Sequence, residues 1–152
     1  IVSARTTGTS SMVRGLLPNH LYHFAVRSTT SRSFSALSAT LSLTTRPSKP
    51  SAPVLVGRGA RCAYLRWFAP THGASKYLLQ KRLHRMLDER AATAQARREM
   101  EGWGQCYAGP ESFFCCESLL KNAAYLFRVV AVSDGVIRGG VVDVACAWRI
   151  VA

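Results

Sequence analysis

An internal repeat constrains the fold of this chain more than any other feature. Residues 16–28 read LLPNHLYHFAVRS and residues 119–131 read LLKNAAYLFRVVA, so the copies share Leu, Leu, Asn, Tyr, Phe and Val in register. Their tyrosines, Tyr22 and Tyr125, are separated by 125 minus 22, or 103, positions. A similarity at this spacing indicates two copies of one structural unit, each about 100 residues long.

The repeated segments have the periodicity of strands. Tyr22, Phe24 and Val26 fall at every second position, and the second copy repeats this pattern from Tyr125. A period of two places one face of a strand in a core. A tyrosine at the start of such a strand, with a leucine six residues earlier, predicts a tyrosine corner, in which the buried ring's hydroxyl bonds the preceding connection.

The repeat resembles fibronectin type III modules. Leu16, Pro18, Tyr22, Phe24 and Val26 match the family pattern of Leu, then Pro four residues before Tyr, then Tyr-x-Phe-x-Val. The second copy has Lys121 where proline is expected, which predicts a looser turn there. The resemblance implies an all-β chain of tandem immunoglobulin-like sandwiches.

Residues after the first copy extend the resemblance. Ala63, Leu65 and Trp67 alternate, and Pro70 follows three residues after the tryptophan, as in the family's second strand with its core tryptophan. Tyr77 then resembles the aromatic residue of the third strand. Gly57-Arg58-Gly59 is too short for a phosphate-binding loop and indicates a turn between strands.

The resemblance divides the chain into three parts. Residues 1–46 are expected to be the C-terminal part of a first module, residues 47–53 a semi-rigid proline-rich linker, and residues 54–152 a complete second module. The partial module is expected to contain strands at Ile1–Met12, Leu21–Thr29 and Ser35–Thr45. Half a sandwich leaves an apolar face open, so we expect upstream residues or a neighbour to cover it.

An inserted helix is expected at about residues 84–101. HRMLDERAATAQARREME contains good helix formers and no Gly or Pro, and Gly102 follows at the position of a left-handed C-cap. Leu83, Leu87, Ala91 and Ala94 would form a thin apolar stripe, and Arg85, Glu89, Arg97 and Glu101 would form ion pairs. Either the helix packs on the sandwich or a partner, or it is an exposed loop with no binding role.

The last predicted strand follows a turn at Gly139-Gly140. Both faces of residues 141–150 carry apolar side chains, which favours a buried strand or one that packs on another chain.

Charge is the strongest compositional signal. The net charge is +12, the first acidic residue is Asp88, and residues 1–87 carry thirteen Lys and Arg. A strongly positive surface favours binding to an anionic partner. The alternative is that the arginines are simply solvated surface residues with no binding partner. The predicted partner contacts are Arg58, Arg61, Arg66, Lys81, Arg82 and Arg85.

The five cysteines favour a reduced state. Their number is odd, Cys115 and Cys116 are adjacent, and no CxxC occurs, which argues against a zinc site and a full disulfide framework. We expect reduced, buried thiols. Neither Asn19 nor Asn122 begins a glycan acceptor, which weakly favours an intracellular location.

Other functions have little support. The carboxylates and histidines lack the spacing of an acid–base pair, a nucleophile or a metal site, so we predict no catalysis, no metal and no cofactor. No apolar run reaches the roughly 18 residues of a membrane helix, and the first 30 residues lack the pattern of a secretion signal. The chain starts at Ile1, which suggests a piece of a longer protein.

The sequence therefore predicts a non-catalytic structural module of a larger intracellular assembly, cytoplasmic or cytoskeletal. It would bind an acidic protein surface through its basic residues, with a microtubule or axonemal lattice as one candidate. Two alternatives stay open: an RNA-associated component of a ribonucleoprotein, and a fragment of an adhesion or receptor ectodomain. Base readout has no support because the aromatic residues occupy core positions.

Overall fold

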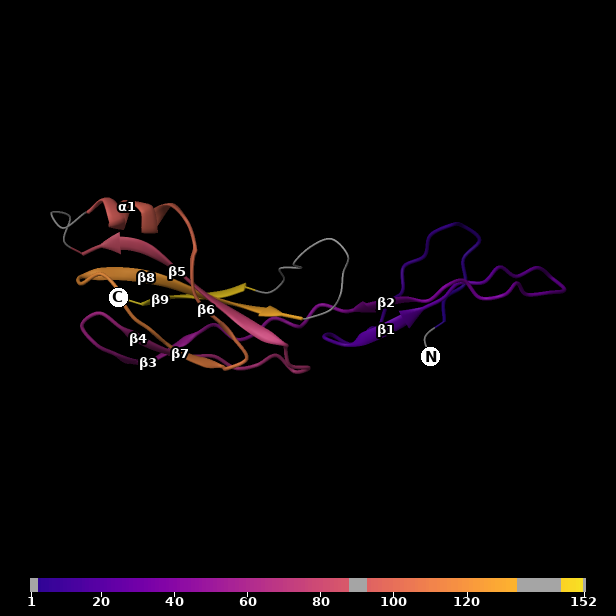
Figure 1. The fold of residues 1–152 in the computed structure, drawn as a ribbon, viewed down its shortest axis with the longest axis horizontal. Helices are drawn as coiled ribbons and strands as arrows, with labels where there is room; N and C mark the ends of the chain where they lie inside the picture. The colour runs from indigo at the N-terminus through magenta and orange to yellow at the C-terminus, as the bar shows by residue number, and fades with distance from the viewer. Residues whose placement is uncertain (1–2, 88–92, 134–145, 152) are drawn as a thin grey trace.

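The computed structural model describes residues 3–87, 93–133 and 146–151, the last of these by its backbone (Figure 1). The elements, in chain order, are β1 (Leu21–Phe24), β2 (Leu41–Thr44), β3 (Val54–Arg58), β4 (Ala63–Arg66), β5 (Lys76–Met86), α1 (Ala94–Glu101), β6 (Gly104–Gly109), β7 (Phe113–Cys116), β8 (Ala123–Val132) and β9 (Cys146–Val151). The regular secondary structure of the described chain is therefore mostly strand, with one short helix.

Strands β3 to β9 form a sandwich of two sheets. One sheet has the order β3-β4-β7 and the other the order β6-β5-β8-β9, and every pairing is antiparallel. The seven strands and their division between two facing sheets confirm the predicted immunoglobulin-like architecture. Strands β1 and β2 pair with each other in a separate sheet at the other end of the molecule (Figure 1).

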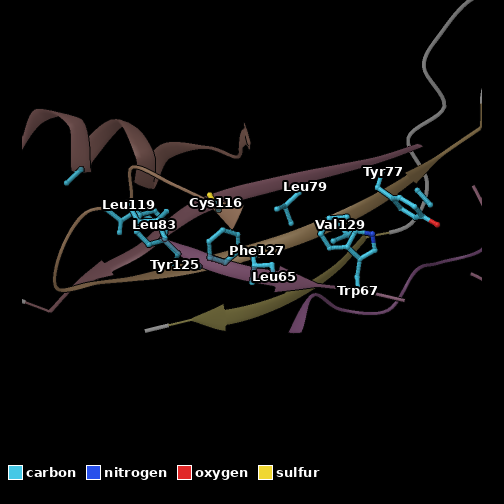
Figure 2. Packing of buried hydrophobic residues seen from close by; sticks show 13 residues of the cluster. Leu65, Trp67, Tyr77, Leu79, Leu83, Cys116, Leu119, Tyr125, Phe127 and Val129 are labelled. Atoms are coloured by element: carbon cyan, nitrogen blue, oxygen red, sulfur yellow. The ribbon is translucent and has the colours of Figure 1, made fainter. Parts of the chain in front are cut away.

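The core lies between the two sheets of the sandwich, where alternate strand residues meet. Strand β4 alternates strictly, and Ala63, Leu65 and Trp67 are each 1% exposed. Figure 2 shows Trp67 and Val129 at one end of this cluster and Leu119 and Tyr125 at the other. The predicted core tryptophan is therefore confirmed, and its ring packs edge-on against Tyr77 of β5.

Both copies of the repeat form a tyrosine corner. The Tyr22 hydroxyl accepts a hydrogen bond from the Leu17 amide at 2.8 Å, and the Tyr125 hydroxyl accepts one from the Leu120 amide at 3.1 Å. Asn19 and Asn122 occupy the same turn position, with φ of 54° and 51°, a left-handed conformation that asparagine tolerates. The copy with Lys121 therefore forms the same turn without the proline, and its corner hydrogen bond is longer, at 3.1 Å against 2.8 Å, so the looser turn expected there stays a prediction.

The first copy has fewer strands than expected. Leu21–Thr29 and Ser35–Thr45 reduce to β1 and β2, and residues 3–12 contain no strand. Thr29 and Phe34 form an isolated bridge. Several large apolar side chains of this sheet and its loops are exposed, including Val26 at 72% and Leu41 at 62%.

The predicted helix was too long. Residues 84–86 belong to β5, where Arg85 pairs with Ala124 and Met86 with Ala123 of β8, and the described helix begins at Ala94. The expected apolar stripe is also wrong. Leu83 is a buried strand residue, Leu87 and Ala94 are exposed, and Ala91 lies outside the described residues.

Helix α1 is held to the sandwich by a buried alanine and a polar contact. Ala96 is fully buried, and the Thr93 hydroxyl caps the helix by accepting a hydrogen bond from the Ala96 amide at 3.2 Å. The Tyr125 hydroxyl donates to the Glu99 carboxylate at 2.8 Å. Gly102 is extended, with φ of −154°, so the predicted left-handed C-cap is wrong.

Strand β9 confirms part of the predicted last strand. Its residues from Cys146 to Val151 pair with β8 from Val130 back to Tyr125. The expected turn at Gly139-Gly140 and the start of that strand at residues 141–145 lie outside the described residues.

Truncating the core tryptophan should destabilise the protein strongly. Trp67→Ala removes a large ring that is 1% exposed, so we expect a loss of about 3–5 kcal/mol in the free energy of unfolding. Urea denaturation of the full chain, followed by circular dichroism, measures the loss. The substitution Tyr64→Ala on the same sheet is the control, because Tyr64 is 49% exposed and its loss should be smaller. Equal losses would show that Trp67 does not anchor the core.

Candidate protein-interaction surface

The six predicted partner contacts come from both sheets of the sandwich. Arg66 faces outward from β4, while Arg58 and Arg61 flank the turn from β3 to β4. The other three come from β5, which belongs to the other sheet. Their common surface therefore stays a prediction, and their surroundings differ.

The outer face of the sheet β3-β4-β7 carries exposed aromatic residues around Arg66. Strand alternation puts Tyr64, Arg66 and Phe68 outside because Ala63, Leu65 and Trp67 point into the core. Phe113 of β7 lies directly opposite Arg66 and is 62% exposed. We call this surface the aromatic face, and its residues are Val54, Val56, Tyr64, Arg66, Phe68 and Phe113.

The aromatic face combines apolar area with a positioned cation. Phe68 is 59% exposed and Val56 is 63% exposed. The Arg66 guanidinium lies 5.3 Å from the centroid of the Phe68 ring, a cation–π contact that orders the arginine. Exposed apolar side chains gathered on one sheet face are typical of interaction sites in soluble proteins.

A small cavity lies at one end of the sandwich, beside the turn between β3 and β4. It has a volume of about 280 Å³ and is lined by Arg58 and Arg61 together with apolar residues such as Leu119 and Phe127. The turn is closed by a hydrogen bond from the Gly59 amide to the Cys62 carbonyl at 3.0 Å. The predicted turn therefore starts at Gly59, while Gly57 lies in β3 beside a bulge.

Lys81 points toward the core instead of the outer surface. Its ammonium lies 3.9 Å from the Glu99 carboxylate and 5.5 Å from the centroid of the Tyr125 ring. Its side chain is 18% exposed. Lys81 thus belongs to the contacts that hold α1 and has little surface to offer a partner.

Arg82 lies on the outer face of the sheet β6-β5-β8-β9. Its guanidinium is 5.2 Å from the centroid of the Trp103 ring, and Arg128 of β8 lies 4.3 Å from the same ring. Arg128 also donates a hydrogen bond through Nε to the Gln80 carboxamide oxygen at 2.6 Å. Trp103, Arg128 and Gln80 were not among the contacts predicted from the sequence. Arg85 is exposed near the end of β5.

The four cysteines whose side chains the structure describes are free thiols. Cys116 is buried, whereas Cys62, Cys106 and Cys115 are half-buried, so the expected full burial holds for one of the four. A hydrogen bond with Cys116 and burial raise the pKa of Cys106, which keeps that thiol protonated and unreactive near neutral pH.

Neither a cluster of metal ligands nor a membrane-spanning helix is found among the described residues. Within residues 3–87, 93–133 and 146–151, no three His, Cys, Asp or Glu side chains gather as metal ligands would. In the same ranges, no helix is long and apolar enough to cross a bilayer.

Comparison with known proteins identifies the fold. No protein-family profile and no curated protein matches the sequence. Among solved structures, a two-domain fibronectin type III segment of chicken tenascin is 14% identical, with a TM-score of 0.57, and the match covers 91% of this chain and 67% of that chain. A fourth FNIII domain from human is 20% identical, with a TM-score of 0.50 and coverage of 70% and 78%. The chain therefore has the fibronectin type III fold.

The Tyr125 hydroxyl should make stability depend on alkaline pH. Burial, followed by the contact with Glu99, raises its pKa above the ordinary value of 10.0. The folded chain then holds the proton more tightly than the unfolded chain does, so this contribution is complete below pH 10 and is lost as pH rises above it. We expect the free energy of unfolding to fall less steeply above about pH 10 in Tyr125→Phe than in the wild type.

Tyr22→Phe is the matched control, since no carboxylate contact is found for the other corner tyrosine within the described chain. Urea denaturation at several pH values measures both variants. Near neutral pH, Tyr125→Phe should also lose about 0.5–1.5 kcal/mol through its missing hydrogen bonds. An unchanged alkaline slope in Tyr125→Phe would contradict the assignment.

Proposed function

We propose that this chain is a non-catalytic protein-interaction module that binds an acidic protein surface through the aromatic face. The aromatic residues exposed around Arg66 carry this proposal. Tyr, Phe and Arg are the residue types enriched in protein interfaces, and a few of them supply most of the binding free energy. The fibronectin type III fold supports an interaction module and leaves the partner open.

The charge of the surroundings favours an acidic partner. Residues 1–87 contain no carboxylate, and this stretch includes β3 and β4, which make up most of the aromatic face. A positive field raises the rate of association with an acidic surface, and the exposed rings then add contact area. Arg66 supplies a guanidinium that is already oriented by Phe68, which lowers the entropy lost on binding.

The assembly that we propose is a large intracellular one, with a microtubule or axonemal lattice as the partner. Tubulin-type polymers repeat an acidic surface many times, which suits a strongly basic module. RNA binding is the competing explanation for a charge of +12, because exposed rings on a sheet face can also stack on bases. The exposed aliphatic residues Val54 and Val56 beside the rings favour a protein surface.

Co-sedimentation of the full chain with polymerised microtubules tests the proposal. Arg66→Glu should weaken binding by about tenfold or more, and Phe68→Ala by about fivefold or more, as expected for central interface residues. Binding of the wild type should weaken as salt rises, because the screening length shortens.

Arg97→Glu is the matched control, since it makes the same charge change at an exposed position on α1. It should weaken binding much less than Arg66→Glu does. Equal losses in the two variants would show that net charge alone drives binding and would overturn the aromatic face. Loss of association after nuclease treatment of a cell extract would favour RNA, and salt-insensitive binding would contradict the acidic partner.

A further inference from the structure

The outer face of the sheet β6-β5-β8-β9 carries a second, independent cluster of cations. Arg82 and Arg128 both lie over the Trp103 ring, at 5.2 and 4.3 Å from its centroid. Gln80 accepts the Nε hydrogen bond of Arg128. We call Gln80, Arg82, Trp103 and Arg128 the arginine–tryptophan cluster. Trp103 reaches it because it follows α1 and immediately precedes β6.

Neither arginine of this cluster has a carboxylate partner within the described residues. The one ion pair found there joins Lys81 to Glu99. Strand residues on the same outward positions, Leu78 and Leu126, are apolar. Two half-buried guanidiniums thus share one indole, and no described carboxylate balances their charge. Partial burial costs solvation, which the ring and Gln80 offset only in part.

The arrangement also fixes the geometry of the arginines. A guanidinium presents several N–H donors in one plane, which matches the two oxygens of a carboxylate. Within the described residues, Arg128 donates to Gln80 through Nε alone, which leaves its other N–H donors to a ligand. Stacking on Trp103 restrains both side chains before any ligand arrives, so binding loses less conformational entropy.

We propose that the arginine–tryptophan cluster is a binding site for the carboxylate side chains of an acidic peptide. Strand β6 stands at the edge of its sheet, with β5 as its sole partner among the described strands. An extended peptide can pair with such an edge through its backbone while its carboxylates reach the adjacent cluster. The edge favours a peptide over a free small anion. This site is on the sheet opposite the aromatic face and does not depend on it.

Titration of the full chain with hexaglutamate, followed by NMR of the Trp103 indole N–H, tests the site. The signal is assigned with the variant Trp103→Phe. Hexaglutamate should shift it, and hexaglutamine should not. Arg82→Gln and Arg128→Gln should each weaken hexaglutamate binding by about fivefold or more, the loss expected for one charged contact.

Arg97→Gln, an exposed charge change on α1, is the matched control and should weaken binding by less than twofold. If Arg128→Gln does not fold, Arg82→Gln and Arg128→Lys still test the site. Arg128→Lys keeps the positive charge but lacks the planar guanidinium, so it should also weaken hexaglutamate binding. Equal effects of Arg82→Gln and Arg97→Gln, or phosphate binding as tightly as the peptide, would overturn the proposal. Arg66→Glu should leave the indole shift in place, which separates this site from the aromatic face.

Discussion

The hydroxyl of Tyr125 makes the contacts on which much of the second module depends. It accepts a hydrogen bond from the Leu120 amide, which fixes the turn into β8, and donates one to Glu99, which attaches α1. The ring itself is 2% exposed and belongs to the core (Figure 2). One side chain therefore couples the packing of the sandwich to the position of the helix. Tyr22 makes the same turn contact in the first copy, where the ring is only half-buried.

The periodic parts of the fold could be predicted from the sequence, and the insertion could not. Alternation alone predicts the strand that leads to Trp67, in which Ala63 and Leu65 are buried. The repeated spacing predicts both tyrosine corners. Residues 84–86 have good helix propensity, yet they continue β5 because β8 supplies ten paired residues beside it. Propensity is local, whereas Arg85 and Met86 pair with residues 39 and 37 positions later in the chain, so no local pattern predicts this pairing.

The candidate surfaces could be predicted only in part from the sequence. Once Leu65 and Trp67 are assigned to the core, Tyr64, Arg66 and Phe68 must face outward, so most of the aromatic face could have been predicted. Phe113 could not, since Phe113 and Phe114 are adjacent and either could be the buried one. The contact of Arg82 and Arg128 with Trp103 needs the pairing of β5 with β6 and β8. A count of basic residues therefore predicts the net charge, but it does not predict which aromatic rings the arginines contact.

Net charge and local geometry act at different ranges in this molecule. The excess of thirteen basic residues before Asp88 produces an attraction that salt screens over about 8–10 Å. Such a field attracts many anions and selects poorly among them. Selecting one anion over another requires hydrogen-bond donors that are held in fixed positions. Here these donors are the guanidinium of Arg66, which contacts Phe68, and those of Arg82 and Arg128, which contact Trp103. Because the two groups lie on opposite sheets, the two acidic ligands that we propose would not compete for the same arginine.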